Sequence, residues 1–247
     1  MDERIALSNR VALVTGGSRG IGRGIAQALA RAGAAVAVNY RHRQDEAAAT
    51  VAEIERTGGR AISVRADVAM RSEVEAMAGQ VGSELGPIDV LVNNAGIATI
   101  RGVDDITEED FDKTLTVNLK SAFLCTQAVV QGMRQRGWGR IVNVSSVAAR
   151  GAGNIGVHYN ASKAGLEGLT RGYAARLAAD GITVNAIAPG LIDTEMAVPL
   201  KESGVADRLP VGRIGTPDEI GQAVLMMIGN GFLTGQTLAV NGGGSFL

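Results

Sequence analysis

The sequence has few residues that form disulfides or bind metals. Its 247 residues include one cysteine and two histidines. Cys125 alone cannot form a disulfide within the chain, which is typical of proteins of the reducing cytosol. Its neighbours Phe123 and Leu124 indicate a buried thiol, and His42 and His158 lack the spacing of a zinc site. We therefore expect no disulfide, no metal and a cytoplasmic protein.

An excess of one charge and long apolar runs are also missing. The 24 basic and 25 acidic residues give a net charge of −1, and the basic residues are scattered. Such a chain has no electrostatic footprint for nucleic acid or for an anionic membrane. The first ten residues carry three charges and no apolar run, so we expect no signal peptide. No apolar run is long enough to span a bilayer.

What the chain does have is a regular alternation of apolar strand-like runs with helical stretches. Hydrophobic residues make up 46% of it. Near-continuous apolar strands are typical of a parallel sheet covered on both faces. The pattern predicts a single α/β domain over residues 1–247, with a doubly wound, seven-stranded parallel sheet and helices on both faces. The predicted strands are Val11–Val14, Ala35–Val38, Ala61–Ala66, Ile88–Val92, Arg140–Val144, Ile182–Ile187 and Gln236–Val240.

Helix ends are marked by capping signals and glycines. Thr107-Glu108-Glu109-Asp110 resembles a capping box that opens one long helix to about Gln135. Thr216 with Pro217 is a second start signal, because proline is favoured at the first helical position. The segment at about 190–215 has no clear period, which is typical of a substrate loop or lid. The other predicted helices are a stretch ending at Ala32, Asp45–Thr57, Ser72–Leu85 and His158–Ala179.

A glycine loop joins the first strand to the first helix. Its pattern is Gly16-x-x-x-Gly20-x-Gly22. Glycines let the backbone approach a phosphate, and a helix N-terminus offers unpaired N–H groups to it. The loop is no ATPase P-loop, because Arg23-Gly24 stands where lysine and serine or threonine are required. On this pattern alone, a merely tight strand–helix turn remains an alternative.

The end of the second strand bears on the choice between NAD and NADP. An acidic residue there would bind the ribose 2′-hydroxyl of NAD. The sequence instead reads Asn39-Tyr40-Arg41-His42-Arg43, with no carboxylate before Asp45. Together with Arg19 of the glycine loop, these arginines suit a 2′-phosphate, because guanidinium groups offer bidentate donors. The pattern favours NADP(H) over NAD(H), although Arg41 and Arg43 could also be ordinary solvated arginines.

Tyr159 and Lys163 share one face of a predicted helix because they are four residues apart. An ammonium beside a phenol favours the phenolate, so we expect the tyrosine pKa to fall from its ordinary value of about 10. Such a tyrosine can act as a general acid or base. The spacing alone is weak, since it also occurs in ordinary surface helices.

With these motifs the chain resembles the classical short-chain dehydrogenase/reductase family from about Asn9 to Gly243. The match includes the T-G-x3-G-x-G loop, Asn93-Asn94-Ala95-Gly96, and Ser146 placed thirteen residues before the Y-x-x-x-K pair. Among family members, β-ketoacyl-[acyl-carrier-protein] reductases and glucose-dehydrogenase-like enzymes are the most similar. One departure is a shortened turn between Met227 and Leu233, which we expect to affect the oligomer interface and the rim of the site.

The resemblance implies a Rossmann fold, hydride transfer between nicotinamide and a carbonyl or alcohol, and a homotetramer. It also implies site residues. Those implied for catalysis are Asn118, Ser146, Tyr159 and Lys163, with Ser145 as a weaker alternative to Ser146. Those implied for the cofactor are Gly16, Ser18, Arg19, Gly20, Ile21, Asn39, Tyr40, Arg41, Asp67, Val68, Asn94, Ala95, Gly96, Tyr159, Lys163, Pro189, Gly190, Ile192 and Thr194.

The substrate is less constrained. The expected walls are small or apolar: residues 97–99, 147–157 and 191–209. They suit a β-ketoacyl thioester, or a ketone or secondary alcohol. An acidic carrier protein would need exposed cations, for which Arg101 and Arg150 are candidates, whereas Arg208 and Arg213 could be structural. A non-catalytic NADP sensor would not need Ser146, Tyr159 and Lys163 together. A sugar-nucleotide epimerase would need a larger C-terminal part.

Overall fold

A computed structural model describes residues 7–197 and 209–246 of the chain. At its centre lies one seven-stranded, all-parallel sheet in the order β3-β2-β1-β4-β5-β6-β7. The predicted fold class is confirmed. The strands are β1 (Val11–Val14), β2 (Ala35–Tyr40), β3 (Arg60–Arg65), β4 (Ile88–Asn93), β5 (Gly139–Val144), β6 (Ile182–Pro189) and β7 (Thr237–Val240).

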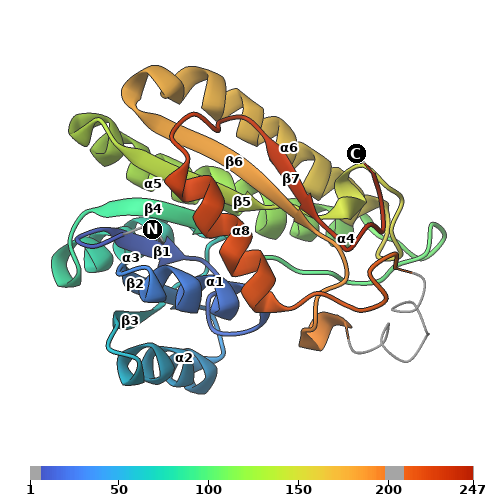
Figure 1. Ribbon diagram of the computed structural model, residues 1–247. Helices are drawn as coiled ribbons and strands as arrows, with labels where there is room; N and C mark the ends of the chain where they lie inside the picture. The colour runs from blue at the N-terminus through green and yellow to red at the C-terminus, as the bar shows by residue number, and fades with distance from the viewer. Residues whose placement is uncertain (1–6, 198–208, 247) are drawn as a thin grey trace.

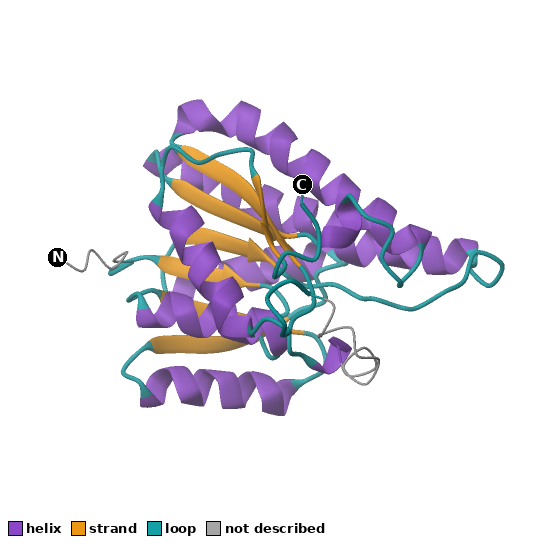
Figure 2. Ribbon diagram, turned by 45° about the vertical axis from the view of Figure 1, so that its right-hand side comes forward, coloured by secondary structure: helices purple, strands orange, loops and turns teal. Residues whose placement is uncertain are grey.

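Helices cover both faces of the sheet (Figure 2). Successive side chains of a strand point to opposite faces. In β1, Ala12 and Val14 therefore pack with one helix layer, and Val11 and Leu13 pack with the other. The first layer is α1 (Gly20–Arg31), α2 (Gln44–Arg56) and α8 (Pro217–Gly229). The second is α3 (Arg71–Glu84), α5 (Ser121–Arg136) and α6 (Val157–Leu177), where Cys125 is buried as expected.

Small residues bring α1 and α8 into close contact on the near side of the sheet (Figure 1). A Cβ added to Gly24 of α1 would lie 2.6 Å from Cβ of Pro217. A Cβ added to Gly221 of α8 would lie 2.8 Å from Cβ of Ala28. The two backbones meet where a side chain would keep them apart, and α8 is thereby fixed beside the helix that follows the glycine loop.

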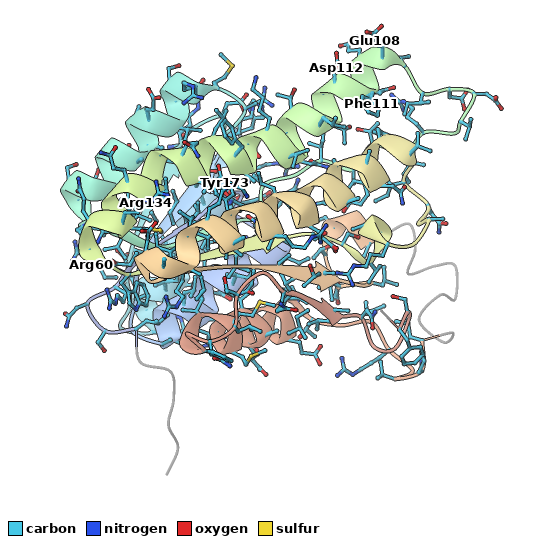
Figure 3. The ribbon with its side chains drawn as sticks, turned by 90° about the horizontal axis from the view of Figure 1, so that it is seen from above. Arg60, Glu108, Phe111, Asp112, Arg134 and Tyr173 are labelled. Carbon is cyan, nitrogen blue, oxygen red and sulfur yellow. The ribbon has the colours of Figure 1, made fainter. Side chains whose placement is uncertain are left out.

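The long helix predicted from Thr107 has three parts. It begins with the expected capping box, in which Thr107 and Asp110 bond reciprocally. α4 (Glu108–Leu115) then passes through a π-helical turn (Thr116–Lys120) into α5. Figure 3 shows this combined helix running beside α6. The prediction of one regular helix is wrong at the π turn, which carries Asn118; such turns are frequent at functional sites.

The N-terminal ends of the strands form the edge opposite the glycine loop. There the ring of Trp138 lies between two arginines: the guanidinium carbon of Arg10 is 3.8 Å from the ring centre and that of Arg140 is 4.4 Å from it. The shortened turn after α8 lies at the same edge, because it leads into the start of β7, and Phe232 in it is fully exposed. The expectation that this turn borders the site is therefore wrong.

Candidate active site

The residues predicted to bind the cofactor lie at the C-terminal edge of the sheet. Parallel strands bring their carboxyl ends to one edge, and ligands bind where the strand order reverses, here between β1 and β4. Asn39 and Tyr40 are the last residues of β2, and Pro189 is the last of β6. The others follow β1 (Gly16, Ser18, Arg19, Gly20, Ile21), β2 (Arg41), β3 (Asp67, Val68), β4 (Asn94, Ala95, Gly96) and β6 (Gly190, Ile192, Thr194).

The glycine loop needs its glycines. Gly16 and Gly20 have φ angles of 60° and 52°, which favour glycine. A Cβ added to Gly22 would lie 2.3 Å from the carbonyl oxygen of Gly16 and 2.5 Å from Nδ2 of Asn94. That Asn94 amide donates to the carbonyl oxygens of Thr15 and Gly16, at 2.9 and 3.0 Å. The Asn94 side chain thus holds the loop in shape.

Asn39 holds the same loop from the other side. Its Oδ1 accepts from the N–H of Gly16 at 3.1 Å, and its Nδ2 lies 3.1 Å from the carbonyl oxygen of Ala66. The side chain is buried and bonded to backbone on both sides of β2. At the position where an acidic residue would bind the 2′-hydroxyl of NAD, this chain therefore has a side chain already bonded to its own backbone.

Carboxylates pair with the arginines expected to bind phosphate. Arg41 Nε lies 3.0 Å from Oδ2 of Asp67, so these two predicted residues contact each other. Arg43 pairs with Glu46 at 2.8 Å, within the first turn of α2. Arg19 pairs with Glu195 and lies 4.0 Å from Glu46. Sequence reasoning missed both glutamates; the i,i+3 spacing of Arg43 and Glu46 was a usable signal, whereas nothing local indicated Glu195.

An open groove of about 570 Å³ extends from this region toward the π turn. Arg41, Asp67 and Ala69 line one side of it. Thr116 and Val117 line the other, two residues or fewer from Asn118. Glu108, Glu109, Asp112 and Lys113 of α4 also line it, so the groove lies between the ends of β2 and β3 and helix α4.

The side chains predicted for catalysis come from the segment after β5, the π turn and α6. Ser146 precedes a short 3₁₀ turn (Val147–Ala149), and its Oγ accepts from the N–H of Ala148 at 3.1 Å. Its own O–H proton is therefore free to be donated. Lys163 Nζ lies 5.7 Å from the ring centre of Tyr159 and donates to the carbonyl oxygen of Val144 at 2.8 Å. The serine, tyrosine and lysine thus form one cluster.

Burial dominates the ionisation of this cluster. It raises the pKa of Tyr159, while a hydrogen bond from Ser146 acts in the opposite direction. It also lowers the pKa of Lys163 to about 8. The sequence-based expectation that the Tyr159 pKa falls below its ordinary value is wrong for this structure. The physical reason is that burial disfavours the charged forms of both groups.

Asn118 and Gly96 frame a space beside the lysine. Asn118 Oδ1 accepts from the N–H of Ile97 at 2.8 Å, and its Nδ2 donates to the Ile97 carbonyl at 3.0 Å. A Cβ added to Gly96 would lie 3.2 Å from Asn118 Oδ1 and 3.7 Å from Lys163 Nζ. The absence of a side chain at Gly96 keeps its backbone close to Asn118 and to the Lys163 ammonium, which could bind hydroxyl groups. Together with the glycine loop, the residues present therefore fit a dinucleotide.

Three polar residues near the cluster have hydrogen-bond partners within the protein. Ser145 Oγ donates to the carbonyl oxygen of Lys163 at 3.2 Å. Asn143 Nδ2 donates to Oγ1 of Thr170 at 2.8 Å. His158 Nε2 lies 3.0 Å from the carbonyl oxygen of Thr99.

The cations considered for an acidic partner are paired with carboxylates. Arg101 lies 2.7 Å from Asp110, and Arg150 lies 2.9 Å from Glu167. Both candidates therefore already have a carboxylate partner within the protein. Arg213 lies 2.6 Å from Glu219, which agrees with a structural role, and Arg208 lies outside the described residues.

The comparisons with known proteins agree with this geometry. A family model described as short chain dehydrogenase matches residues 10–204. The chain belongs to the short-chain dehydrogenase family. It is 43% identical over 242 residues to a 3-oxoacyl-[acyl-carrier-protein] reductase of Synechocystis, covering 96% of this chain and 98% of that one. It is 43% identical over 245 residues to an acetoacetyl-CoA reductase of Rhizobium meliloti, with 96% and 99% covered.

Solved structures of this family have the same fold. A short-chain type dehydrogenase/reductase from Mycobacterium marinum superposes with a TM-score of 0.92 at 35% identity, over 98% of this chain and 97% of that one. A dehydrogenase/reductase from Sinorhizobium meliloti gives 0.90 at 38%, over 97% and 96%. Within residues 7–197 and 209–246, no helix could cross a membrane and no acidic, histidine or cysteine side chains cluster as metal ligands.

Proposed function

We propose that this short-chain dehydrogenase is an NADPH-dependent carbonyl reductase whose substrate is a 3-oxoacyl thioester. The observation that carries the proposal is the cluster of Ser146, Tyr159 and Lys163 beside the glycine loop. The two reductases at 43% identity support the thioester, since each is named for a 3-oxoacyl thioester. The apolar walls expected around the cluster suit an acyl chain.

The cofactor would lie along the C-terminal edge of the sheet. The backbone of the glycine loop would hold the phosphates, while Asp67 and Val68 would border the adenine. Arg19 and Arg41 would hold the 2′-phosphate of NADPH after leaving their carboxylate partners. Lys163 would hold the ribose hydroxyls next to Gly96. The bound nicotinamide supplies the hydride in reduction and accepts it in oxidation.

The protein's own residues position the carbonyl and supply the proton. Ser146 donates its O–H to the carbonyl oxygen, and this bond strengthens as negative charge develops there. Tyr159 donates its phenolic proton to the same oxygen and would take one back in the reverse reaction. The Lys163 ammonium stabilises the resulting phenolate. Asn118 holds the π turn in place and would bind a water that links Lys163 to solvent.

The first test replaces the proton donor. Tyr159→Phe keeps the ring and removes the hydroxyl, so turnover of acetoacetyl-CoA should fall by about 10²–10⁴-fold, the usual contribution of general acid catalysis. NADPH binding, measured by calorimetry, should persist. Undiminished turnover would overturn the mechanism, and a wild-type enzyme inactive on every thioester would overturn the substrate class.

The NADPH preference has a separate test. The ratio of kcat/KM for NADPH to that for NADH should exceed one and should fall in Arg41→Ala, because that variant loses a donor to the 2′-phosphate. Arg56→Ala is the matched control, since Arg56 forms an exposed pair with Glu53 at the far end of α2. A ratio that is unchanged in Arg41→Ala would mean that Arg41 does not bind the 2′-phosphate.

A ketone or secondary alcohol without a carrier is the second candidate substrate. The pairing of Arg101 with Asp110 and of Arg150 with Glu167 favours it, because an acidic carrier protein would find these cations already neutralised. Comparing acyl-carrier-protein thioesters, coenzyme A thioesters, cyclic ketones and sugars under one assay separates the two.

We further propose a homotetramer, as the family resemblance implies, and a cytoplasmic location, which fits a single buried cysteine.

A further inference from the structure

Helix α6 carries a buried carboxylate that the proposed reaction does not use. We propose that Glu167 and its partner Arg150 are positioning residues, which hold the turn bearing Ser146 against the helix bearing Tyr159. The inference rests on the function proposed above, since it assigns the way in which Ser146 is aimed.

The contacts of Glu167 reach both ends of the Ser146 turn. Its Oε2 accepts from Arg150 Nε at 2.9 Å, directly after the 3₁₀ turn. Its Oε1 lies 3.4 Å from Oγ of Ser145, directly before Ser146. That Ser145 hydroxyl also lies 3.2 Å from the carbonyl oxygen of Lys163, one helical turn before Glu167. One side chain of α6 thus ties both flanks of the turn to the helix.

Burial makes this contact specific. The Glu167 side chain is 5% exposed, whereas Arg150 is 39% exposed. A buried carboxylate is costly unless both oxygens have partners, and removing one partner is then strongly unfavourable. Most other ion pairs of the described residues lie nearer the surface, such as Arg134 with Asp180 at 49% and 34% exposed; the carboxylate of comparable burial is Asp89, which pairs with Arg10 and Arg136. Glu167 is therefore held in one place, and through Ser145 and Arg150 it fixes the position of the Ser146 turn.

A second side chain of α6 holds the middle of the same turn. Asn160, next to Tyr159, donates through Nδ2 to the carbonyl oxygens of Ala148 and Gly151, each at 2.7 Å. The N–H of Ala148 in turn donates to Ser146 Oγ, so the position of this turn determines the position of the serine hydroxyl. The separation of Ser146 and Tyr159 is thus set by contacts within the protein itself.

A mutant cycle with Ser146 tests the role in turnover. Glu167→Gln should lower kcat by roughly ten- to a hundredfold, the order expected for a small misplacement, with the NADPH dissociation constant unchanged. In a Ser146→Ala background the same change should cost nothing more, because residues acting through one group are non-additive. Arg150→Lys, which keeps the charge, should retain more activity than Arg150→Met. Equal losses with and without Ser146 would overturn the inference.

A readout without substrate separates this inference from the proposed function. The Ser146 hydrogen bond lowers the pKa of Tyr159. Titrating the phenol by ultraviolet absorbance, against Tyr159→Phe as blank, should give a higher pKa in Glu167→Gln and in Ser146→Ala alike. Asp180→Asn is the control, because it breaks an ion pair at the other end of α6 and should leave the pKa unchanged. An unshifted pKa in Glu167→Gln would overturn the inference even if no substrate were found.

Discussion

Lys163 carries a charge where burial opposes it. Its side chain is almost fully enclosed, and its ammonium donates to the carbonyl oxygen of Val144. The lowered pKa of about 8 means that the proton is held only weakly near neutral pH. A hydroxyl-rich ligand beside Gly96 would offer new acceptors to the ammonium, so we expect binding to strengthen the charged form.

This ionisation predicts a pH dependence of stability. The unfolded chain keeps the lysine proton up to the ordinary pKa of 10.5, whereas the folded chain loses it above about pH 8. In that window the unfolded state binds more protons, so the free energy of unfolding rises with pH. At about 1.4 kcal/mol per pKa unit, wild type should gain roughly 2 kcal/mol relative to Lys163→Met between about pH 8 and pH 10.

Urea denaturation followed by circular dichroism at several pH values measures that difference. Because other titrating groups are common to both proteins, their contributions cancel. A difference that stays flat across the window would mean that Lys163 keeps an ordinary pKa in the folded protein.

At the residue scale, spacing could predict which side chains meet but not how they ionise. The helical period alone places Lys163 one turn after Tyr159. The direction of the Tyr159 pKa depends on how deeply β5 and the 3₁₀ turn enclose the phenol, which is a tertiary property. The partners of Arg19 and Arg150 were missed for the same reason: Glu195 and Glu167 approach them only through the fold.

At the element scale, the glycine loop and α1 form one fitted unit. Gly22→Ala should abolish NADPH binding and destabilise the protein, because its Cβ would lie 2.3 Å from the Gly16 carbonyl oxygen. Gly79→Ala in α3 is the control. Nothing lies within 4 Å of its added Cβ, so better helix propensity should raise stability by about 0.5–1 kcal/mol. Thermal melting measures the stability of the two variants, and titration measures their NADPH affinity. Tight NADPH binding by Gly22→Ala would contradict the predicted clash with the Gly16 carbonyl oxygen.

The pair of Arg19 and Glu195 links the glycine loop to the segment after β6. Both side chains are largely exposed, so the pair is worth only about 0.2–1 kcal/mol. Since a phosphate would need the same guanidinium, Glu195→Gln should tighten NADPH binding by up to about fivefold. Titration calorimetry measures this, with Glu53→Gln in α2 as control. Weaker binding in Glu195→Gln would mean that Glu195 aids the cofactor instead of competing with it.

Strand ends show where element prediction is limited. Apolar runs located all seven strands, yet β2 continues through Asn39 and Tyr40, which the run of valines and alanines does not indicate. Both residues pair with Val64 and Arg65 of β3, so a neighbouring strand extends the element. The π turn at Asn118 was equally invisible, because no residue pattern distinguishes it from regular helix.

At the scale of the whole molecule, the alternation of strands and helices sufficed to predict a parallel sheet, because only crossover helices join parallel neighbours. No local sequence pattern predicts the strand order that places β1 beside β4. It follows from packing both helix layers onto one sheet, and it creates the edge where the glycine loop meets Asn94.

The homotetramer is tested on the intact chain. Sedimentation equilibrium should give four times the mass of one chain. If burial of the fully exposed Phe232 contributes to assembly, replacing it by serine should shift the equilibrium toward smaller species. A purely monomeric wild type would contradict the proposal.

The position of Trp138 determines what the fluorescence of the protein reports. It is the only tryptophan in the chain, and it is enclosed by Arg10 and Arg140 at the sheet edge opposite the site. All indole fluorescence therefore comes from one place, where the Arg10 cation is lost from the ring when the segment before β1 separates from the segment before β5. Its emission is a built-in reporter of unfolding at that edge, free of direct contact with anything bound at the other.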